Sequence, residues 1–376
     1  MKIRVAPQPG LDSIPPYKPG RSIEEIQRQY GIQDVIKLAS NENPLGASPK
    51  ALTAISQFFS KVNFYPDGQC FNLRHTLAQK LDVKPEQIII GNGEDGLILE
   101  TCMAYLDDTS QVIMSQSSFP VYDIYASGMR ARLVKTPLKN YGLDLEAMSA
   151  AITGQTKLIF VCNPNNPTGT TVSAAEVTRF LARVPDDVLV IFDEAYLEYV
   201  DDPDFPDSLP YVREGRENII VMRTFSKIYG LAGLRLGYAI AAPSTLAHLY
   251  CVKEPFSVNM LAQIAGEAAL GDDEFLKRTL VVNRSGRDYL YKEFDRLDLA
   301  YLQTQANFIL VELGPHAGEI VEQLMQKGVI VRPCAGYDLP AFARISIGSA
   351  EQNERLVKTL EEVLYGRQYP TERVLP

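Results

Sequence analysis

Short apolar runs recur along the middle of the chain, and stretches with helical periodicity separate several of them. The runs are rich in β-branched residues, which is typical of buried strands. They occupy residues 88–90, 112–114, 132–134, 158–162, 188–192, 219–222 and 236–240. Helix-like segments lie at residues 96–105, 120–127 and 174–183. This alternation predicts an α/β fold with a mainly parallel, doubly wound sheet that is covered on both faces.

The pattern changes after about residue 275. Long charged helical stretches alternate there with two apolar strands, which indicates a smaller α+β domain. The helical stretches cover residues 275–297, 317–327 and 350–364, and the strands cover residues 307–311 and 344–347. At the other end, the first 40 residues are proline-rich and cannot build a core alone. We therefore expect an N-terminal arm that joins part of the small domain (1–45), a large domain (46–275) and a C-terminal small domain (276–376).

Composition narrows the class of protein. The 376 residues are 46% hydrophobic and 22% charged, as in ordinary globular enzymes. A net charge of −9 argues against nucleic acid or an anionic membrane as the main partner. No apolar run approaches the ~20 residues of a membrane span. The five cysteines are an odd number and widely spread, and the three histidines form no metal motif. We expect a cytoplasmic enzyme without a catalytic metal.

A lysine-containing segment follows the apolar run at residues 219–222. Lys227 lies just past that predicted strand, at the sheet edge where ligand sites of α/β proteins open. Small residues surround it, so backbone can approach a ligand closely. Arg235 follows eight residues later, with a guanidinium fork suited to phosphate. Alone, this segment is better explained as a surface lysine in a glycine-rich loop.

The glycine-rich segment at residues 91–96 also follows a predicted strand. Its backbone amides would form a phosphate cradle at the start of the next helix. The segment spells G-x-G-x-x-G, so a nicotinamide oxidoreductase is an alternative from another class. That fingerprint needs an acidic residue at the carboxyl end of the next strand, where this chain has only Ser and Gln at residues 115–118. The acids Asp107 and Asp108 precede the strand, so this alternative is disfavoured.

Two more polar segments follow strands of the same predicted sheet. Residues 163–169 read Asn-Pro-Asn-Asn-Pro-Thr-Gly, and residues 193–196 read Asp-Glu-Ala-Tyr. A carboxylate at the end of an apolar strand is costly unless it meets a cation. With Lys227 and Arg235, the sheet edge collects an amine, a carboxylate, a phenol, an amide and a phosphate site. Pyridoxal 5'-phosphate needs this set: a lysine for the Schiff base, a carboxylate for the pyridinium nitrogen and a phosphate anchor.

With these motifs the sequence resembles the fold-type I pyridoxal-phosphate aminotransferases, and most closely the histidinol-phosphate aminotransferase family. The resemblance spans the chain from Pro15 to Gly348. The motifs at 163–169, 193–196 and 226–235 are specific to the superfamily. The segments 41–44, 65–68 and 253–259 point to the narrower family, which more often has Asn where this chain has Ser257. Relatives also commonly have Ser-Asp-Glu or Ala-Asp-Glu where this chain reads Glu-Asp-Gly at residues 94–96.

The resemblance assigns the cofactor-binding roles. Lys227 would form the Schiff base and move the substrate α-proton, and Asp193 would keep the pyridine nitrogen protonated. Tyr196 and Asn166 would hydrogen-bond the cofactor's phenolic oxygen, and Phe119 would lie against the ring. The phosphate would be held by the following groups: the side chains of Thr224, Ser226 and Arg235, and the backbone amides of Glu94 and Asp95.

The resemblance also implies a homodimer with shared active sites. Tyr65 would reach the phosphate of the other subunit's cofactor. Arg344 would bind the substrate carboxylate, with Arg332 as a plausible helper, and Tyr17 and Asn43 would form part of the substrate-side wall. The expected reaction transfers an amine between glutamate and imidazole-acetol phosphate in two half-reactions. An aromatic aminotransferase and a threonine-phosphate decarboxylase share every quoted motif, so both remain alternative functions. A catalytically inactive relative is a poor alternative, because Lys227 and Asp193 are intact.

Overall fold

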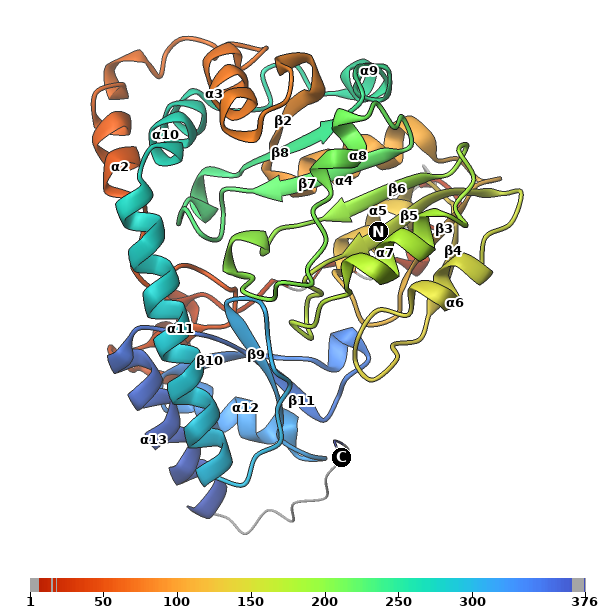
Figure 1. Ribbon diagram of the computed structural model, residues 1–376. Helices are drawn as coiled ribbons and strands as arrows, with labels where there is room; N and C mark the ends of the chain where they lie inside the picture. The colour runs from red at the N-terminus through yellow and green to blue at the C-terminus, as the bar shows by residue number, and fades with distance from the viewer. Residues whose placement is uncertain (1–6, 15, 18, 367–374, 376) are drawn as a thin grey trace.

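The structure, a computed structural model, describes residues 7–14, 16, 17, 19–366 and 375. Within these residues the chain forms a seven-stranded and a four-stranded sheet, each packed against helices (Figure 1). Pro15, where the resemblance begins, and Lys18 lie outside the described residues. No helix in the described part of the chain is both long and apolar enough to cross a bilayer. The same part contains no group of His, Cys, Asp and Glu side chains suited to a metal ion.

The large sheet contains the seven predicted strands. Its order is β2-β8-β7-β6-β5-β3-β4, and β8 is antiparallel to both neighbours while the other pairs are parallel. The strands are β2 (Ile88–Asn92), β3 (Gln111–Ser115), β4 (Arg132–Thr136), β5 (Thr156–Cys162), β6 (Leu189–Asp193), β7 (Ile219–Thr224) and β8 (Leu236–Ala241). The prediction of a mainly parallel α/β sheet is confirmed.

Helices cover both faces of this sheet, which explains why its central strands are mostly apolar, whereas the edge strand β4 keeps the exposed Arg132 and Lys135. In β2, Ile88 and Ile90 join one hydrophobic core and Ile89 joins the other, since successive side chains point to opposite faces. One core includes residues of α3 (Phe71–Leu81), α6 (Leu145–Ala150), α7 (Ala174–Leu181), α8 (Leu209–Arg213) and α10 (Met260–Leu270). The other includes residues of α4 (Gly93–Tyr105), α5 (Pro120–Gly128) and α9 (Pro243–Val252).

The small sheet has two strands that the sequence pattern did not predict. Its order is β1-β10-β11-β9, with β1 parallel to β10 and the other pairs antiparallel. The strands are β1 (Ile36–Leu38), β9 (Phe308–Glu312), β10 (Val329–Pro333) and β11 (Phe342–Ser346). The strands β9 and β11 were expected. We missed β1 because its three residues, Ile-Lys-Leu, contain no apolar run, and we did not predict β10 although residues 329–331 form one.

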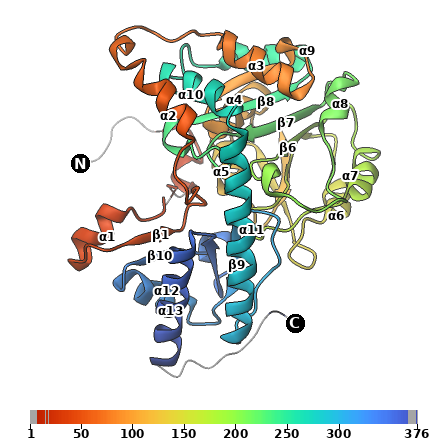
Figure 2. The same cartoon turned by 60° about the vertical axis from the view of Figure 1, so that its left-hand side comes forward.

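Helices α1 (Ile23–Tyr30), α12 (Ala317–Gln326) and α13 (Ala350–Gly366) pack with the small sheet. The long helix α11 (Asp273–Arg296) runs alongside both parts of the molecule, from the vicinity of α2 (Pro49–Ser56) to that of α13 (Figure 2). Through β1, the N-terminal segment adds a strand to a sheet otherwise built from the C-terminal part of the chain. The division at residues 45 and 275 stays a prediction.

Candidate active site

A pocket of about 260 Å³ opens where β5, β6 and β7 end, between the large and small sheets. The last residues of these three strands, Cys162, Asp193 and Thr224, all line it. On the other side it is lined by Arg332 and Arg344 of the small sheet. Most site residues expected from the sequence line this pocket: Tyr17, Glu94, Asp95, Phe119, Asn166, Asp193, Tyr196, Thr224, Ser226, Lys227, Arg235 and Arg344. The exceptions are Tyr65 and Asn43.

Lys227 presents its amine to this pocket. The Nζ atom donates to the carbonyl oxygen of Ser40 at 3.4 Å and lies 5.6 Å from the centre of the Tyr196 ring. Burial, and next the positive charge of Arg344, lower the pKa of the amine to about 8. A lysine with such a pKa is partly neutral near physiological pH, so it can act as a nucleophile and as a proton carrier.

Asp193 is the last residue of β6 and is only 3% exposed. Its Oδ2 accepts a hydrogen bond from the Tyr122 hydroxyl, and its Oδ1 accepts one from the Ala195 backbone amide at 3.1 Å. Burial raises the pKa of this carboxyl, while the hydrogen bonds of Tyr122 and Glu94 act in the opposite direction. A buried carboxylate is stabilised by a cationic partner, so Asp193 is well suited to a protonated ring nitrogen.

Glu94 has a side-chain contact that the sequence did not predict. Helix α4 begins at Gly93, so the Glu94 and Asp95 amides lie in the first turn, where a helix binds anions. The Glu94 carboxyl turns into the pocket and shares a hydrogen bond with Asp193. Burial, and next the charge of Asp193, raise the pKa of Glu94 well above its usual value. Two carboxyl groups can share this bond only if one of them is protonated.

A set of hydroxyl, guanidinium and amide groups forms an anion cradle at the same end of the pocket. The Thr224 hydroxyl donates to the Ser226 hydroxyl oxygen at 2.9 Å. Arg235 has a φ of +55° and pairs with the Asp95 carboxylate at 2.9 Å. Gly93 has a φ of +70°, a left-handed conformation that favours glycine, and its backbone lies close to the Arg235 guanidinium, which is 2.6 Å from where a Cβ would be. These donors fit a phosphate group.

Asn166 and Tyr196, the amide and the phenol expected near the cofactor ring, also line the pocket. Asn166 Oδ1 accepts a hydrogen bond from Arg344, and the Tyr196 hydroxyl accepts one from Asn41 Nδ2 at 2.9 Å. Asn41, which we did not predict as a site residue, lines the pocket and is buried. Its backbone amide donates to Ser346 Oγ at 2.8 Å. Its φ of +56° is left-handed, a conformation that asparagine tolerates. This angle is known only from the fold, so the sequence alone contains no signal for this residue.

Asn43 is a correction to the predicted site. It is buried, but it does not line the pocket. Its Nδ2 donates to the Ile228 carbonyl oxygen at 2.9 Å, and its Oδ1 accepts from the Leu45 amide at 3.0 Å. The asparagine therefore shapes the turn 43–46 behind Lys227. Asn41 and Asn43 are only two residues apart, but Asn41 lines the pocket, whereas Asn43 is buried against Ile228 and Leu45 outside it.

Two arginines form the small-sheet wall. Arg344 on β11 lies directly opposite Arg332 on β10, so both side chains project from the same face. Arg344 is 5% exposed and donates to the Ala39 carbonyl oxygen at 2.7 Å. Its Nε is buried without a hydrogen-bond partner among the described residues. A guanidinium that still has a donor to satisfy is suited to an acidic ligand.

Phe119 and Tyr17 also line the pocket. Phe119 directly precedes α5, and its ring lies edge-on to that of Tyr122 at 5.6 Å. Tyr17 comes from the N-terminal arm, and burial raises the pKa of its hydroxyl. The hydroxyl of Tyr122, three residues beyond Phe119, was the main contact to Asp193 that we missed, because nothing in the sequence shows which way a residue of α5 points.

Tyr65 lies elsewhere on the surface. It is 81% exposed and its ring stacks on that of Phe256, with centroids 4.9 Å apart. Several large apolar side chains nearby in sequence are exposed as well: Leu52, Phe59, Val62, Phe64 and Phe71. Such an accumulation of exposed apolar residues is typical of a protein–protein interface. Within one chain, therefore, Tyr65 takes no part in the pocket.

Comparison with known proteins identifies the family of the chain. The sequence model of the family described as "Aminotransferase class I and II" matches residues 33–360. The chain belongs to this family. It is 49% identical over 352 residues to the histidinol-phosphate aminotransferase of Moorella thermoacetica, covering 94% of this chain and 91% of that protein. It is 44% identical to the corresponding enzyme of Brevibacillus brevis, covering 96% of this chain and 99% of that protein.

Among solved structures, that of histidinol-phosphate aminotransferase from Sinorhizobium meliloti in complex with pyridoxal-5'-phosphate superposes with a TM-score of 0.89. The two sequences are 29% identical, and the match covers 96% of this chain and 97% of the other. The family predicted from the sequence motifs is thus confirmed, and the protein is an aminotransferase. The individual site residues remain predictions.

Proposed function

We propose that this protein is a pyridoxal-phosphate-dependent histidinol-phosphate aminotransferase. It would interconvert L-histidinol phosphate plus 2-oxoglutarate with imidazole-acetol phosphate plus glutamate, a step of histidine biosynthesis. The observation that supports this most is the single pocket that joins Lys227 and Asp193 to the paired arginines 332 and 344. The relatives of 49% and 44% identity, which match over nearly their whole length, support the same substrate.

The residues present fit the cofactor. Thr224, Ser226, Arg235 and the first amides of α4 would hold its phosphate, and Lys227 would hold it covalently. When bound, pyridoxal phosphate supplies an electron sink for the charge left at the substrate carbon after proton removal. Asp193 holds a proton on the ring nitrogen, which that sink requires. The Lys227 amine, with a pKa lowered to about 8, takes the substrate proton and later returns it.

Both substrates carry an acidic group to the same small-sheet wall. Histidinol phosphate has a phosphate but no α-carboxylate, whereas glutamate has carboxylates. Arg344 and Arg332 face the pocket together, so two guanidinium groups are available to either anion. A guanidinium fork binds carboxylate and phosphate in the same bidentate manner. One wall can therefore serve both half-reactions, as a reaction with two alternating substrates requires.

We also propose that the protein is a cytoplasmic homodimer with shared active sites. The exposed Tyr65, the apolar side chains around it and their distance from this chain's own pocket support the shared arrangement. In such a dimer the Tyr65 hydroxyl of each subunit would contact the cofactor phosphate of its partner. The biosynthetic relatives and the cysteines, none of which is disulfide-bonded in the described residues, support the location.

A substrate panel tests the proposed reaction. The purified holoenzyme is mixed in a stopped-flow instrument with histidinol phosphate, phenylalanine or threonine phosphate, and the cofactor absorbance is followed. We expect histidinol phosphate to react at least ~100-fold faster than phenylalanine, about 2.7 kcal/mol, if a specific phosphate contact is made. An equally fast reaction of phenylalanine or tyrosine would favour an aromatic aminotransferase. Release of carbon dioxide from threonine phosphate would favour a decarboxylase.

Arg344→Lys sharpens the same experiment. A point charge cannot replace the bidentate fork, so both glutamate and histidinol phosphate should bind more weakly. Lys157→Ala serves as the matched control, because this cation lies on β5 and does not line the pocket. Weakening of only one of the two substrates would show that they do not share the arginine.

A further inference from the structure

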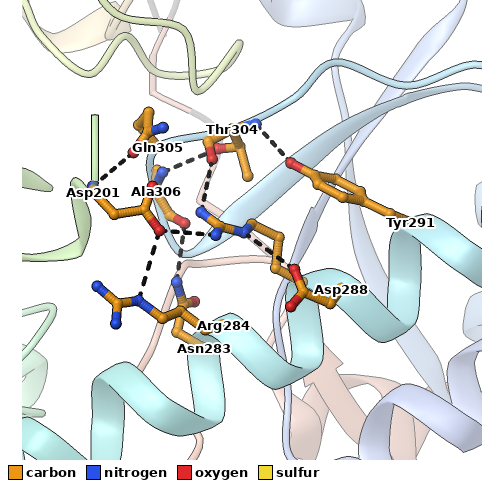
Figure 3. Close-up of polar contacts among 9 residues, drawn as sticks. Asp201, Asn283, Arg284, Asp288, Tyr291, Thr304, Gln305 and Ala306 are labelled. Carbon is orange, nitrogen blue, oxygen red and sulfur yellow. Dashed lines mark hydrogen bonds and ion pairs between the residues drawn. The ribbon is translucent and has the colours of Figure 1, made fainter. Parts of the chain in front are cut away.

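A cluster of polar contacts lies outside the pocket, where the chain enters β9. Its members are Asp201, helix α11 residues Asn283, Arg284, Arg287, Asp288 and Tyr291, and the segment Thr304–Ala306. Figure 3 labels all of them except Arg287. At its centre, Gln305 makes two contacts with the large domain. Its backbone amide donates to the Gly169 carbonyl oxygen at 2.8 Å, and its side-chain oxygen accepts from the Asp201 amide at 2.9 Å.

The two contacts of Gln305 reach both loops that carry the predicted ring-binding residues. Gly169 ends the loop 163–169, which contains Asn166. Asp201 follows the short 3-10 turn Leu197–Tyr199, which directly follows Tyr196. The pocket itself contains Asn166 and Tyr196 but not Gln305. One residue from the small-domain side therefore fixes the far ends of two loops whose near ends face the cofactor site.

The first of these loops fits tightly against its neighbour. Gly169 has a φ of +74°, and a Cβ at this position would lie 2.1 Å from the hydroxyl oxygen of Thr304. Thr304 is buried, and its hydroxyl accepts from the Ala306 amide at 3.0 Å. No side chain beyond hydrogen fits between the two segments. The distance between loop 163–169 and the Thr304–Ala306 segment is therefore set by the close approach of the Gly169 backbone to the Thr304 side chain.

Helix α11 holds the Thr304–Ala306 segment in place. The Tyr291 hydroxyl accepts from the Thr304 amide at 2.7 Å (Figure 3). Arg287 donates to the Thr304 carbonyl oxygen at 3.4 Å and to the Asp201 carboxylate at 2.9 Å. Its side chain is only 14% exposed, so this ion pair is poorly screened. Arg284 approaches the same carboxylate only to 3.6 Å and is 55% exposed, which makes it the weaker partner.

We propose that Gln305 is a positioning residue: by joining Gly169 and Asp201, it sets where Asn166 and Tyr196 stand in the cofactor site. Arg287 supports it by holding Asp201 and Thr304 from α11. The proposal rests on the proposed function in one respect, because it takes Asn166 and Tyr196 to be hydrogen-bond partners of the cofactor's phenolic oxygen. Those bonds set the pH at which the spectrum of the bound cofactor changes. Displaced loops would alter them without removing either side chain.

The test is a pH titration of the cofactor spectrum of the holoenzyme. Gln305→Met keeps the length of the side chain and removes the acceptor for the Asp201 amide. We expect the spectral midpoint to move by about half a pH unit or more, as loss of an ordinary hydrogen bond allows. Gln305→Glu retains an acceptor oxygen and should restore most of the midpoint. Gln303→Met is the matched control, since this exposed glutamine lies two residues away in the same segment, and it should leave the midpoint unchanged.

A second pair of variants keeps the proposal testable if Gln305→Met does not fold. Arg287→Met should move the midpoint in the same direction, and Arg284→Met should leave it within error. Asn166→Ala and Tyr196→Phe separate this proposal from the assignment on which it rests. If neither of them moves the midpoint, the assignment of these two residues fails. If both do but Gln305→Met and Arg287→Met do not, Gln305 and Arg287 are merely structural and the positioning proposal is overturned.

Discussion

The buried pocket and the exposed segment around Tyr65 differ in how their functional residues are held. In the pocket, Asp193 ends one strand of the large sheet and Lys227 follows another, and both are fixed by contacts within the chain. Tyr65 follows a short turn, is 81% exposed and stacks on Phe256, which is itself 49% exposed. Asp193 and Lys227 are thus held within a single chain, whereas the Tyr65 segment projects apolar surface toward solvent.

This difference separates two kinds of functional residue. Parallel strands deliver their carboxyl ends to one edge, so groups from distant parts of the sequence meet there without a partner. An exposed tyrosine among exposed apolar side chains gains a fixed position only when a second surface covers it. The pocket should therefore respond to substitutions in its own chain, and the Tyr65 segment should respond to what its partner subunit carries.

The largest effect is expected at Lys227. Lys227→Ala removes both the covalent attachment and the proton carrier, and loss of proton transfer alone should slow turnover by roughly 10²- to 10⁴-fold. Reduction of the wild-type protein with borohydride, followed by peptide mapping, should find the cofactor on this lysine. Cofactor mapped to any other lysine would show that the pocket has been misassigned.

Asp193→Asn should have the next largest effect. The variant should still bind the cofactor, but a neutral amide cannot keep the pyridine nitrogen protonated. Loss of a charge-assisted hydrogen bond worth ~1.5–3 kcal/mol corresponds to a rate reduction of roughly 10- to 150-fold. Single-turnover rates measured at saturating cofactor check this expectation. Turnover close to that of the wild type would mean that the carboxylate has only a structural role.

The sequence predicted the position of a functional side chain where that side chain directly follows a predicted strand in the same short segment. Asp193 and Lys227 could be placed at the sheet edge because an apolar run comes directly before each segment. The contacts of Asn41 and Tyr122 could not be foreseen, since they depend on how the N-terminal arm and α5 pack over the sheet. Periodicity shows which face of an element is buried, but not which groups meet there.

The Glu94 side chain is a second example of a contact that the sequence does not reveal. The sequence correctly placed residues 93–95 at a helix start, where only backbone amides matter for a phosphate. It gave no reason to expect the carboxyl to reach Asp193, almost a hundred positions later. That contact exists because α4 and β6 converge on the pocket in three dimensions.

A mixed dimer tests the Tyr65 side of the comparison. Tyr65→Phe should lower activity by roughly tenfold through loss of one hydrogen bond to a charged group, and Lys227→Ala should be nearly inactive. In a two-fold dimer with shared sites, a heterodimer places both lesions in one site and leaves the other whole. Random subunit exchange at equal amounts should then restore roughly a quarter of wild-type activity.

The exchange itself is verified by labelling the two variants with different affinity tags. A mixture of Lys227→Ala with Asp193→Asn is the matched control, because both residues belong to the pocket of their own chain and no whole site can form. Confirmed exchange without recovery in the Tyr65 mixture would place that tyrosine in its own subunit's site, or outside any site.

The smallest effect is expected for Glu94→Gln, measured as thermal stability of the cofactor-free protein. Glu94 faces Asp193, Asp95 and Lys227, and its pKa is raised well above the usual 4.5 by burial and then by Asp193. A carboxyl with a raised folded-state pKa stabilises the fold below the unfolded pKa of about 4.5, and this contribution is lost as the pH rises through the folded value. Wild-type stability should therefore fall on going from pH 5 toward pH 8.

A glutamine at position 94 cannot ionise, yet its amide can still donate to Asp193. The variant should show a flatter pH profile and unfold a few degrees higher near pH 8, because a glutamine cannot become a buried charge as the pH rises. Asp95→Asn is the control, because Asp95 is more exposed and pairs with Arg235. If Glu94→Gln leaves the slope between pH 5 and pH 8 unchanged, the shared hydrogen bond with Asp193 contributes nothing to the stability of the pocket.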